Sequence, residues 1–180
     1  MTISKKLVAT SVLAIMMSLV MAPSVKVYAI EGSTQSVAEP TAGELTEEEI
    51  ITEGADALDS FTKEELIKFT EGLMKSDENA EVKFTTGDDY ALAEVAFEDV
   101  GEFAKIAKED SQYIDSWNYV VDSMRQVTEV YAPYYQKFGM DFSICVVDDK
   151  NPGTALIYCK NGEVIYDCVN NIGSESDIIR

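Results

Sequence analysis

The feature that most constrains the fold of this chain is one long helical stripe of apolar residues between Phe103 and Phe138. Its members recur at steps of three and four residues, as on one side of a helix: Phe103, Ile106, Tyr113, Trp117, Val120, Met124, Val127, Tyr131, Tyr134 and Phe138. A single helix over residues 99–138 would be about 60 Å long, whereas a compact domain of this size is about 35–40 Å across. Because Asp110 interrupts the stripe, we predict two helices that meet at Glu109–Ser111.

The same stripe would also fit a coiled coil, but the residues beside it show no consistent pairing of opposite charges. One apolar side is sufficient for a helix that lies across a sheet, and we prefer that interpretation. Pro133 is expected to kink or loosen the last turns, and Gly139 is expected to end the helix.

Two further helices are predicted before the stripe. Thr46 and Thr62 are each followed three residues later by a glutamate. In this pattern two side chains and two backbone N–H groups cap a helix start reciprocally. The helix that begins at Thr62 is predicted to run to about Ser76, because apolar residues continue on one side as far as that point.

Five strands are predicted from apolar runs that turn residues separate. Two strands precede the stripe and three follow it. In order they are 82–84, Tyr90–Phe97, Asp141–Val147, Thr154–Lys160 and Glu163–Val169. We expect turns at residues 86–89, at Pro152-Gly153 and at Asn161-Gly162.

These elements predict the fold class and the domain limits. The order is α-α-β-β-α-β-β-β, which makes an α+β domain with an antiparallel sheet and helices packed on one face. Residues 45–170 form this single domain, and the tail at 171–180 is expected to fray.

The turn at Asn161-Gly162 is the strongest hairpin signal, because both residues adopt the positive φ that a type I′ turn needs. A two-residue turn sets the register of the hairpin. It places Lys160 opposite Glu163, Cys159 opposite Val164 and Cys168 opposite Ala155.

Three cysteines, Cys145, Cys159 and Cys168, allow one internal disulfide at most. All three lie in strand-like runs, where a free cysteine behaves as a small apolar residue. The hairpin register separates Cys159 from Cys168, and diagonal neighbours on adjacent strands, as Cys145 and Cys159 would be, lie too far apart for a bridge. We therefore expect packed, reduced thiols, with a single disulfide as the alternative.

Residues 1–29 have the organisation of a secretory signal peptide. Lys5 and Lys6 precede an uncharged run over 7–25, and Val27-Tyr28-Ala29 offers the small-x-small pattern that signal peptidase cleaves. We expect cleavage after Ala29 and a secreted, extracellular protein. The alternative is an uncleaved N-terminal anchor, since the run is just long enough to span a bilayer. The small polar residues of 30–44 are expected to form a disordered linker.

The charge balance and the absence of histidine exclude several function classes. The chain carries 14 basic and 33 acidic side chains, a net charge of −19 and no histidine. Nucleic acid and anionic membrane surfaces are excluded as partners, because phosphate binding needs a basic surface. Ser-His and Cys-His catalytic pairs and His-ligated metals are excluded as well. Self-repulsion favours a monomer.

No motif predicts a catalytic residue, a metal ligand or a bound cofactor. Asp148, Asp149 and Asn151 could supply oxygen ligands to calcium, but their spacing does not match an EF-hand loop. Turn chemistry explains them without a ligand. Carboxylate pairs could also cleave glycosides, yet 33 acids make chance pairs inevitable. A calcium-dependent domain or a small carboxylate-based enzyme therefore remains the alternative to a binding protein.

Tyrosines are the other candidates for a binding surface, because the side chain combines apolar area with a polar tip. Tyr131, Tyr134, Tyr158 and Tyr166 are expected at the edge of the core. Tyr135 lies off the apolar stripe, so we expect it to be exposed and to contribute, with the three loop residues above, to a candidate interaction surface.

From Trp117 to Asn170 the chain resembles uncharacterised small exported proteins of Gram-positive bacteria. The shared residues are Trp117-Asn118, Asp149, Asn151-Pro152, Leu156, Asn161-Gly162 and Tyr166-Asp167. The resemblance implies an exported protein and a helix followed by three strands, and it carries no activity, cofactor or partner with it. A looser similarity to cystatin-like domains rests on topology alone.

Together these features predict a secreted, acidic, non-catalytic binding module. Its partner would be an unknown protein or a component of the cell surface.

Overall fold

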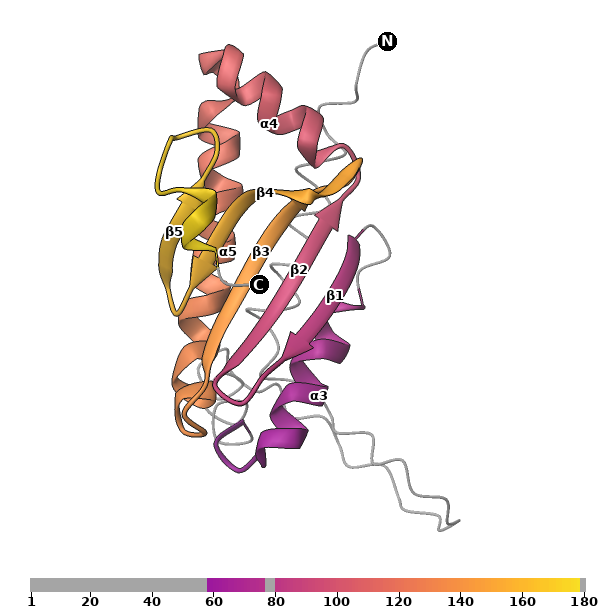
Figure 1. Cartoon of the computed structure of the whole chain (residues 1–180), viewed down its shortest axis with the longest axis vertical. Helices are drawn as coiled ribbons and strands as arrows, with labels where there is room; N and C mark the ends of the chain where they lie inside the picture. Colours follow the sequence, from indigo (N-terminus) through magenta and orange to yellow (C-terminus); the bar gives the residue numbers. More distant parts are fainter. Residues whose placement is uncertain (1–57, 77–79, 179–180) are drawn as a thin grey trace, which may run out of the picture.

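A five-stranded sheet in the order β1-β2-β3-β4-β5 organises the fold (Figure 1). The computed structural model describes residues 58–76 and 80–178. The strands are β1 (Ala80–Thr86), β2 (Tyr90–Phe97), β3 (Asp141–Asp148), β4 (Asn151–Lys160) and β5 (Glu163–Asp167). The main helices are α3 (Lys63–Met74), α4 (Val100–Glu109) and α5 (Ile114–Gln136). The predicted signal peptide, the linker and the helix starting at Thr46 lie outside the described residues.

The chain is α+β as predicted, but its sheet is mixed. β2 and β3 run parallel, and the other three neighbouring pairs are antiparallel. The prediction of a purely antiparallel sheet is therefore wrong. The connection from β2 to β3 passes through α4 and α5, and such a long crossover brings the chain back to start a parallel strand.

The three helices share one apolar core with one face of the sheet. Trp117 and Tyr131 of α5, Leu66 of α3 and Phe142 of β3 are all almost completely buried in this core. Figure 1 shows α5 running behind β4 and β5, with α4 beyond the upper end of the sheet. The other face carries a smaller apolar cluster around Cys145, against which Ile178 packs. No helix within the two described ranges is long and apolar enough to cross a membrane.

The predicted helix limits follow from capping. At the start of α3, Thr62 N donates to Glu65 Oε2 over 2.9 Å and Glu65 N to Thr62 Oγ1 over 3.3 Å, so the capping box is confirmed. The predicted break in the stripe is also confirmed. Asp110 Oδ1 accepts from Gln112 N over 3.0 Å and begins the short helix η2 (Ser111–Tyr113), after which α5 starts.

The end of α5 is confirmed as well. Gly139 has a φ of +71°, the left-handed conformation that glycine adopts at helix ends. Gly139 N donates to Gln136 O over 3.0 Å. Pro133 lies inside α5.

The β4–β5 hairpin has the predicted turn and, near it, the predicted register. Lys160 pairs with Glu163 and Cys159 with Val164. A bulge then shifts the register, so that Cys168 N donates to Leu156 O over 2.9 Å and the predicted pairing with Ala155 is wrong.

The β3–β4 turn is shorter than predicted. Asp148 pairs with Asn151, so the turn consists of Asp149 and Lys150. Pro152 and Gly153 lie within β4, and the predicted corner at these two residues is wrong.

The C-terminal residues fold back onto β5, in contrast to the expected fraying. Asp167 and Ile172 exchange two backbone hydrogen bonds of 3.0 and 3.1 Å. Gly173 is required in this turn, because a Cβ atom there would lie 1.9 Å from the carbonyl oxygen of Ile165. A short helix η3 (Glu175–Asp177) follows.

All three cysteines lie among the described residues, and each carries a reduced thiol. Cys145 pairs with Tyr158 and Cys159 with Ile144, so the two thiols lie on opposite faces of the sheet. Cys159 belongs to the main core and Cys145 to the smaller cluster.

Candidate functional site

The outer side of α5 is the candidate site. The inner side of this helix packs in the core, but its outer side exposes two large apolar side chains. Tyr119 is 50% exposed and Val130 is 44% exposed. They are three helical turns apart, and at 3.6 residues per turn they lie on the same side. We call the exposed residues Tyr119, Asp122, Glu129 and Val130, with the partly buried Arg125 and Gln126, the α5 outer surface.

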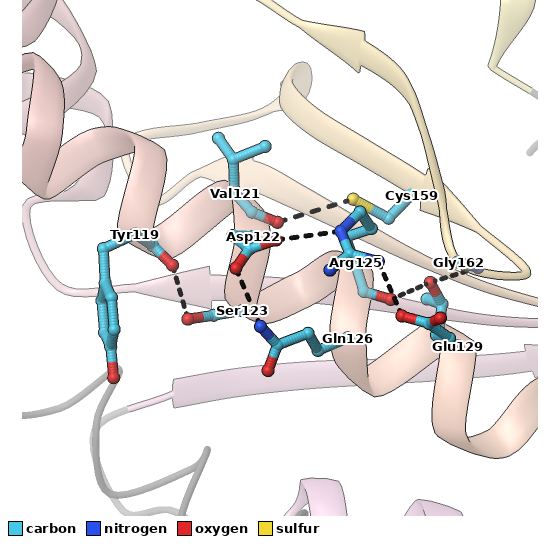
Figure 2. A network of polar contacts seen from close by, with 10 residues as sticks. Tyr119, Val121, Asp122, Ser123, Arg125, Gln126, Glu129, Cys159 and Gly162 are labelled. Carbon is cyan, nitrogen blue, oxygen red and sulfur yellow. Dashed lines mark hydrogen bonds and ion pairs between the residues drawn. The ribbon is translucent and has the colours of Figure 1, made fainter.

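A network of charged groups holds the polar side chains of this surface (Figure 2). Arg125 Nε donates to Asp122 Oδ1 over 2.9 Å, and Arg125 Nη1 donates to Glu129 Oε2 over 2.6 Å. Gln126 Nε2 donates to Asp122 Oδ2 over 2.8 Å. These residues are three and four positions apart, the spacing at which side chains on a helix meet. The polar groups beside Tyr119 and Val130 are therefore already ordered.

The α5 outer surface is also anchored to the sheet. Thr128 Oγ1 donates to the Arg125 carbonyl over 2.8 Å and accepts from Gly162 N, in the β4–β5 turn, over 3.0 Å. Gly162 has a φ of +87°, and a Cβ atom there would approach Glu129 Cβ to 3.0 Å. The turn and the helix therefore pack closely at this point, which fixes the surface on rigid elements.

The three predicted loop residues lie together at the β3–β4 turn. Asp149 Oδ2 accepts from Asp99 N over 3.1 Å, and Asp149 Oδ1 accepts from Gly101 N over 3.3 Å. Asp99 precedes α4 with a φ of +60° and makes no capping bond with its own side chain. Asp149 therefore caps α4 from a distant part of the chain.

The other groups at this turn are also engaged. Asp148 is 8% exposed, and its Oδ1 accepts from Lys150 N over 2.9 Å. Lys150 Nζ lies 2.9 Å from Asp99 Oδ1, and Asn151 Nδ2 donates to Thr154 Oγ1 over 2.7 Å. Within residues 58–76 and 80–178, no group of three His, Cys, Asp or Glu side chains is placed to hold a metal ion.

The predicted exposure of Tyr135 is wrong. The residue is 0% exposed, and its ring stacks on Phe142 with centroids 4.8 Å apart. Burial raises the pKa of Tyr135 to about 12, and the nearby Thr70 of α3 partly offsets this increase. No hydrogen bond of acceptable geometry reaches the Tyr135 hydroxyl within the described part of the chain. Tyr135 is thus a core residue between the sheet and α3, and is no part of an interaction surface.

A buried carboxylate at the end of β5 joins side chains of α5 and of the chain after β5. Asp167 is 0% exposed, and its Oδ1 accepts from Trp117 Nε1 over 2.9 Å and from Val169 N over 2.9 Å. Asn170 Nδ2 donates to Asp167 Oδ2 over 2.5 Å and to Asn118 Oδ1 over 2.9 Å. This cluster connects α5 to the end of β5.

The thiols of Cys159 and Cys168 are poor nucleophiles in this environment. Burial raises the pKa of Cys159 to about 12 and that of Cys168 to about 11, and the nearby Asp167 contributes to both increases. Both side chains therefore stay protonated at neutral pH, whereas the thiolate is the reactive form.

No family model, no curated protein and no solved structure matches the chain.

Proposed function

We propose that the protein is an exported, acidic, non-catalytic binding module that contacts a protein or a cell-surface component through the α5 outer surface. The observation that carries the proposal is the exposure of Tyr119 beside an ordered polar network. Tyrosine and arginine are enriched among the residues that contribute most to binding. Ordered side chains lose less conformational entropy when a partner binds.

The placement of the acidic side chains supports binding over catalysis. Asp149 caps α4, and Asp167 accepts hydrogen bonds from Trp117 and the backbone. These carboxylates hold the fold together, and their oxygens are already bound by donors. The acidic side chains that do lie at the α5 outer surface, Asp122 and Glu129, both pair with Arg125.

Export belongs to the same proposal. Residues 1–29 direct the chain out of the cytoplasm, residues 30–44 link this segment to the folded domain, and that domain includes the C-terminal residues that pack on β5. The signal-like segment and the resemblance to small exported Gram-positive proteins support this arrangement.

The proposal is tested by recovering a partner from the growth medium and the cell-surface fraction with immobilised protein. The double substitution Tyr119→Ala and Val130→Ser should weaken retention of the partner about tenfold or more. The matched control is Ile172→Ala, which removes an exposed apolar side chain outside α5 that is 41% exposed. Equal retention by the double variant and the wild type would contradict the proposal, as would failure of the wild type to retain any partner.

A further inference from the structure

The outer edge of β1 is the one open edge of the sheet that carries an alternating charge pattern. β1 pairs with β2 alone, and no other described element lies beyond it (Figure 1). Its sequence alternates Glu81 and Lys83 with Val82 and Phe84. Glu81 is exposed, and the Lys83 side chain is 75% exposed. An edge strand of this kind presents unpaired N–H and C=O groups to another strand.

The hairpin register determines which backbone groups point outward. Gly87 N donates to Tyr90 O over 2.9 Å, so Gly87 and Tyr90 form a hydrogen-bonded pair. Hydrogen-bonded and non-hydrogen-bonded pairs alternate in an antiparallel ladder. The pairing of Lys83 with Glu94 is then of the hydrogen-bonded kind. Consequently the backbone groups of Val82 and Phe84 point away from β2 and are available at the edge.

We propose that this edge binds a second copy of the chain, with β1 antiparallel to its counterpart across a two-fold axis at Val82. In this register Val82 meets Val82 of the second copy as a hydrogen-bonded pair, and Ala80 meets Phe84. Glu81 of each copy then lies opposite Lys83 of the other. Such directly opposed side chains lie close together and interact favourably when their charges differ. A two-fold axis forms both ion pairs at once.

Neighbouring registers lack this complementarity. An axis at Lys83 sets two lysines against each other, and an axis at Glu81 does the same with two glutamates. An axis at Phe84 places Lys83 opposite Thr85. Among the registers that preserve the outward hydrogen-bonding groups, only the axis at Val82 pairs opposite charges. The net charge of −19 opposes association of two copies, so the dimer should strengthen as moderate salt screens the long-range repulsion.

Charge reversal at β1 tests the proposal through a mixing experiment. Glu81→Lys alone places two lysines opposite each other at both positions, and Lys83→Glu alone places two glutamates there. The dimerisation affinity of each single variant should therefore be at least about tenfold lower than that of the wild type. Mixed in equal amounts, the two variants have opposite charges at both positions and should form a heterodimer with about the affinity of the wild type.

The oligomeric state is measured by sedimentation velocity and native mass spectrometry at micromolar protein concentrations. The full chain is expressed in a bacterial host that exports it, and the exported protein is purified. Far-UV circular dichroism confirms that each variant is folded, because Lys83→Glu also loses the ion pair with Glu94. Glu64→Lys and Lys75→Glu on α3 are matched controls for net charge and should dimerise as the wild type does.

Heterodimers in the mixture, together with monomeric single variants, would support the proposal. A wild type that stays monomeric throughout would overturn it, and would indicate that Glu81 and Lys83 instead prevent pairing at this edge. Dimers that persist unchanged in both single variants would overturn it as well, because the interface would then lie elsewhere.

Discussion

At the scale of single residues, the buried carboxylate of Asp167 shows how one side chain can hold several parts of a fold. It accepts hydrogen bonds from the indole of Trp117, from the backbone of Val169 and from Asn170. A buried charge is tolerated when donors replace the water it loses. Removing a single donor therefore affects both the packing of α5 and the environment of the charge.

Trp117→Ala should lower the free energy of unfolding by about 3–5 kcal/mol, because it empties a large volume in the core and removes a donor to Asp167. Trp117→Phe keeps most of the apolar volume and loses only the donor, so its cost should be smaller. Urea denaturation followed by far-UV circular dichroism measures both changes. A cost below about 1 kcal/mol for the alanine variant would contradict the buried position.

Tyr135→Phe should leave the stability at neutral pH unchanged or slightly higher, because the buried hydroxyl that it removes has no hydrogen-bond partner among the described residues. The same variant should resist alkali better. Burial raises the pKa of Tyr135 to about 12, whereas it is about 10 in an unfolded chain. The folded protein thus holds this proton more tightly. Its stability is intact below pH about 10 and falls by about 1.4 kcal/mol per unit as pH rises to about 12.

The measurement for Tyr135→Phe is the free energy of unfolding as a function of pH. Other buried groups such as Tyr131, whose pKa burial also raises, give the wild type and the variant a common decline. Parallel curves for the two proteins above pH 10 would show that Tyr135 ionises as freely in the folded state as in the unfolded one.

At the scale of elements, the β3–β4 turn and α4 depend on each other. The first turn of α4 receives its cap from Asp149, and Asp148 packs so closely on Gly101 that a Cβ atom there would lie 2.4 Å from its carboxylate. The turn is therefore part of the helix start, although about 50 residues separate the two in the sequence.

Asp149→Ala should cost about 0.5–2 kcal/mol, the usual range for loss of a helix cap. Asp88→Ala, in the β1–β2 turn, is the matched control and should change the stability by less than about 0.5 kcal/mol. Thermal melting in a calcium titration is the companion measurement, and calcium should leave the melting temperature of the wild type unchanged. A rise that saturates with calcium, and that Asp149→Ala abolishes, would instead identify the turn as a cation site.

The sequence predicts local features of these elements better than their arrangement. Caps at Thr62 and Asp110 and the turn at Asn161 depend on neighbours in the chain, and all three were predictable. The parallel pairing of β2 with β3 has no such local signal, because it depends on how the crossover packs. The bulge that shifts the register between β4 and β5 is likewise not predictable from the alternation of residue types.

The candidate site was only partly predictable for the same reason. Asp148, Asp149 and Asn151 were expected together because they are nearly consecutive. The stripe predicts an exposed Tyr135 because it assumes a helix with one buried side, whereas α5 contacts both the sheet and α3. Tyr119 also lies off the stripe, and it is exposed. Position relative to the stripe therefore does not predict which of the two tyrosines is buried.

At the scale of the whole molecule, the export proposal leads to a prediction about the mature N-terminus. Cleavage after Ala29 should release a protein that begins at Ile30, because Val27-Tyr28-Ala29 fits the signal peptidase pattern. Mass spectrometry of protein from the culture medium checks this. Ala29→Arg, which places a large charged residue at the cleavage site, should keep the precursor intact. Recovery of the wild type only from membranes, with Met1 or Thr2 at its start, would contradict cleavage and support an anchor.

The long-range partners of Trp117 and of the α4 cap also determine when the domain can fold. A growing chain that ends before residue 149 has no cap for α4, and one that ends before residue 167 has no acceptor for the Trp117 indole. Such non-local contacts form late and slow the search for the native state. Synthesis from the N-terminus therefore leaves the domain without these two connections until residue 167 has emerged, and a chain that is unfolded until then is in the state that threading through a narrow secretion channel requires.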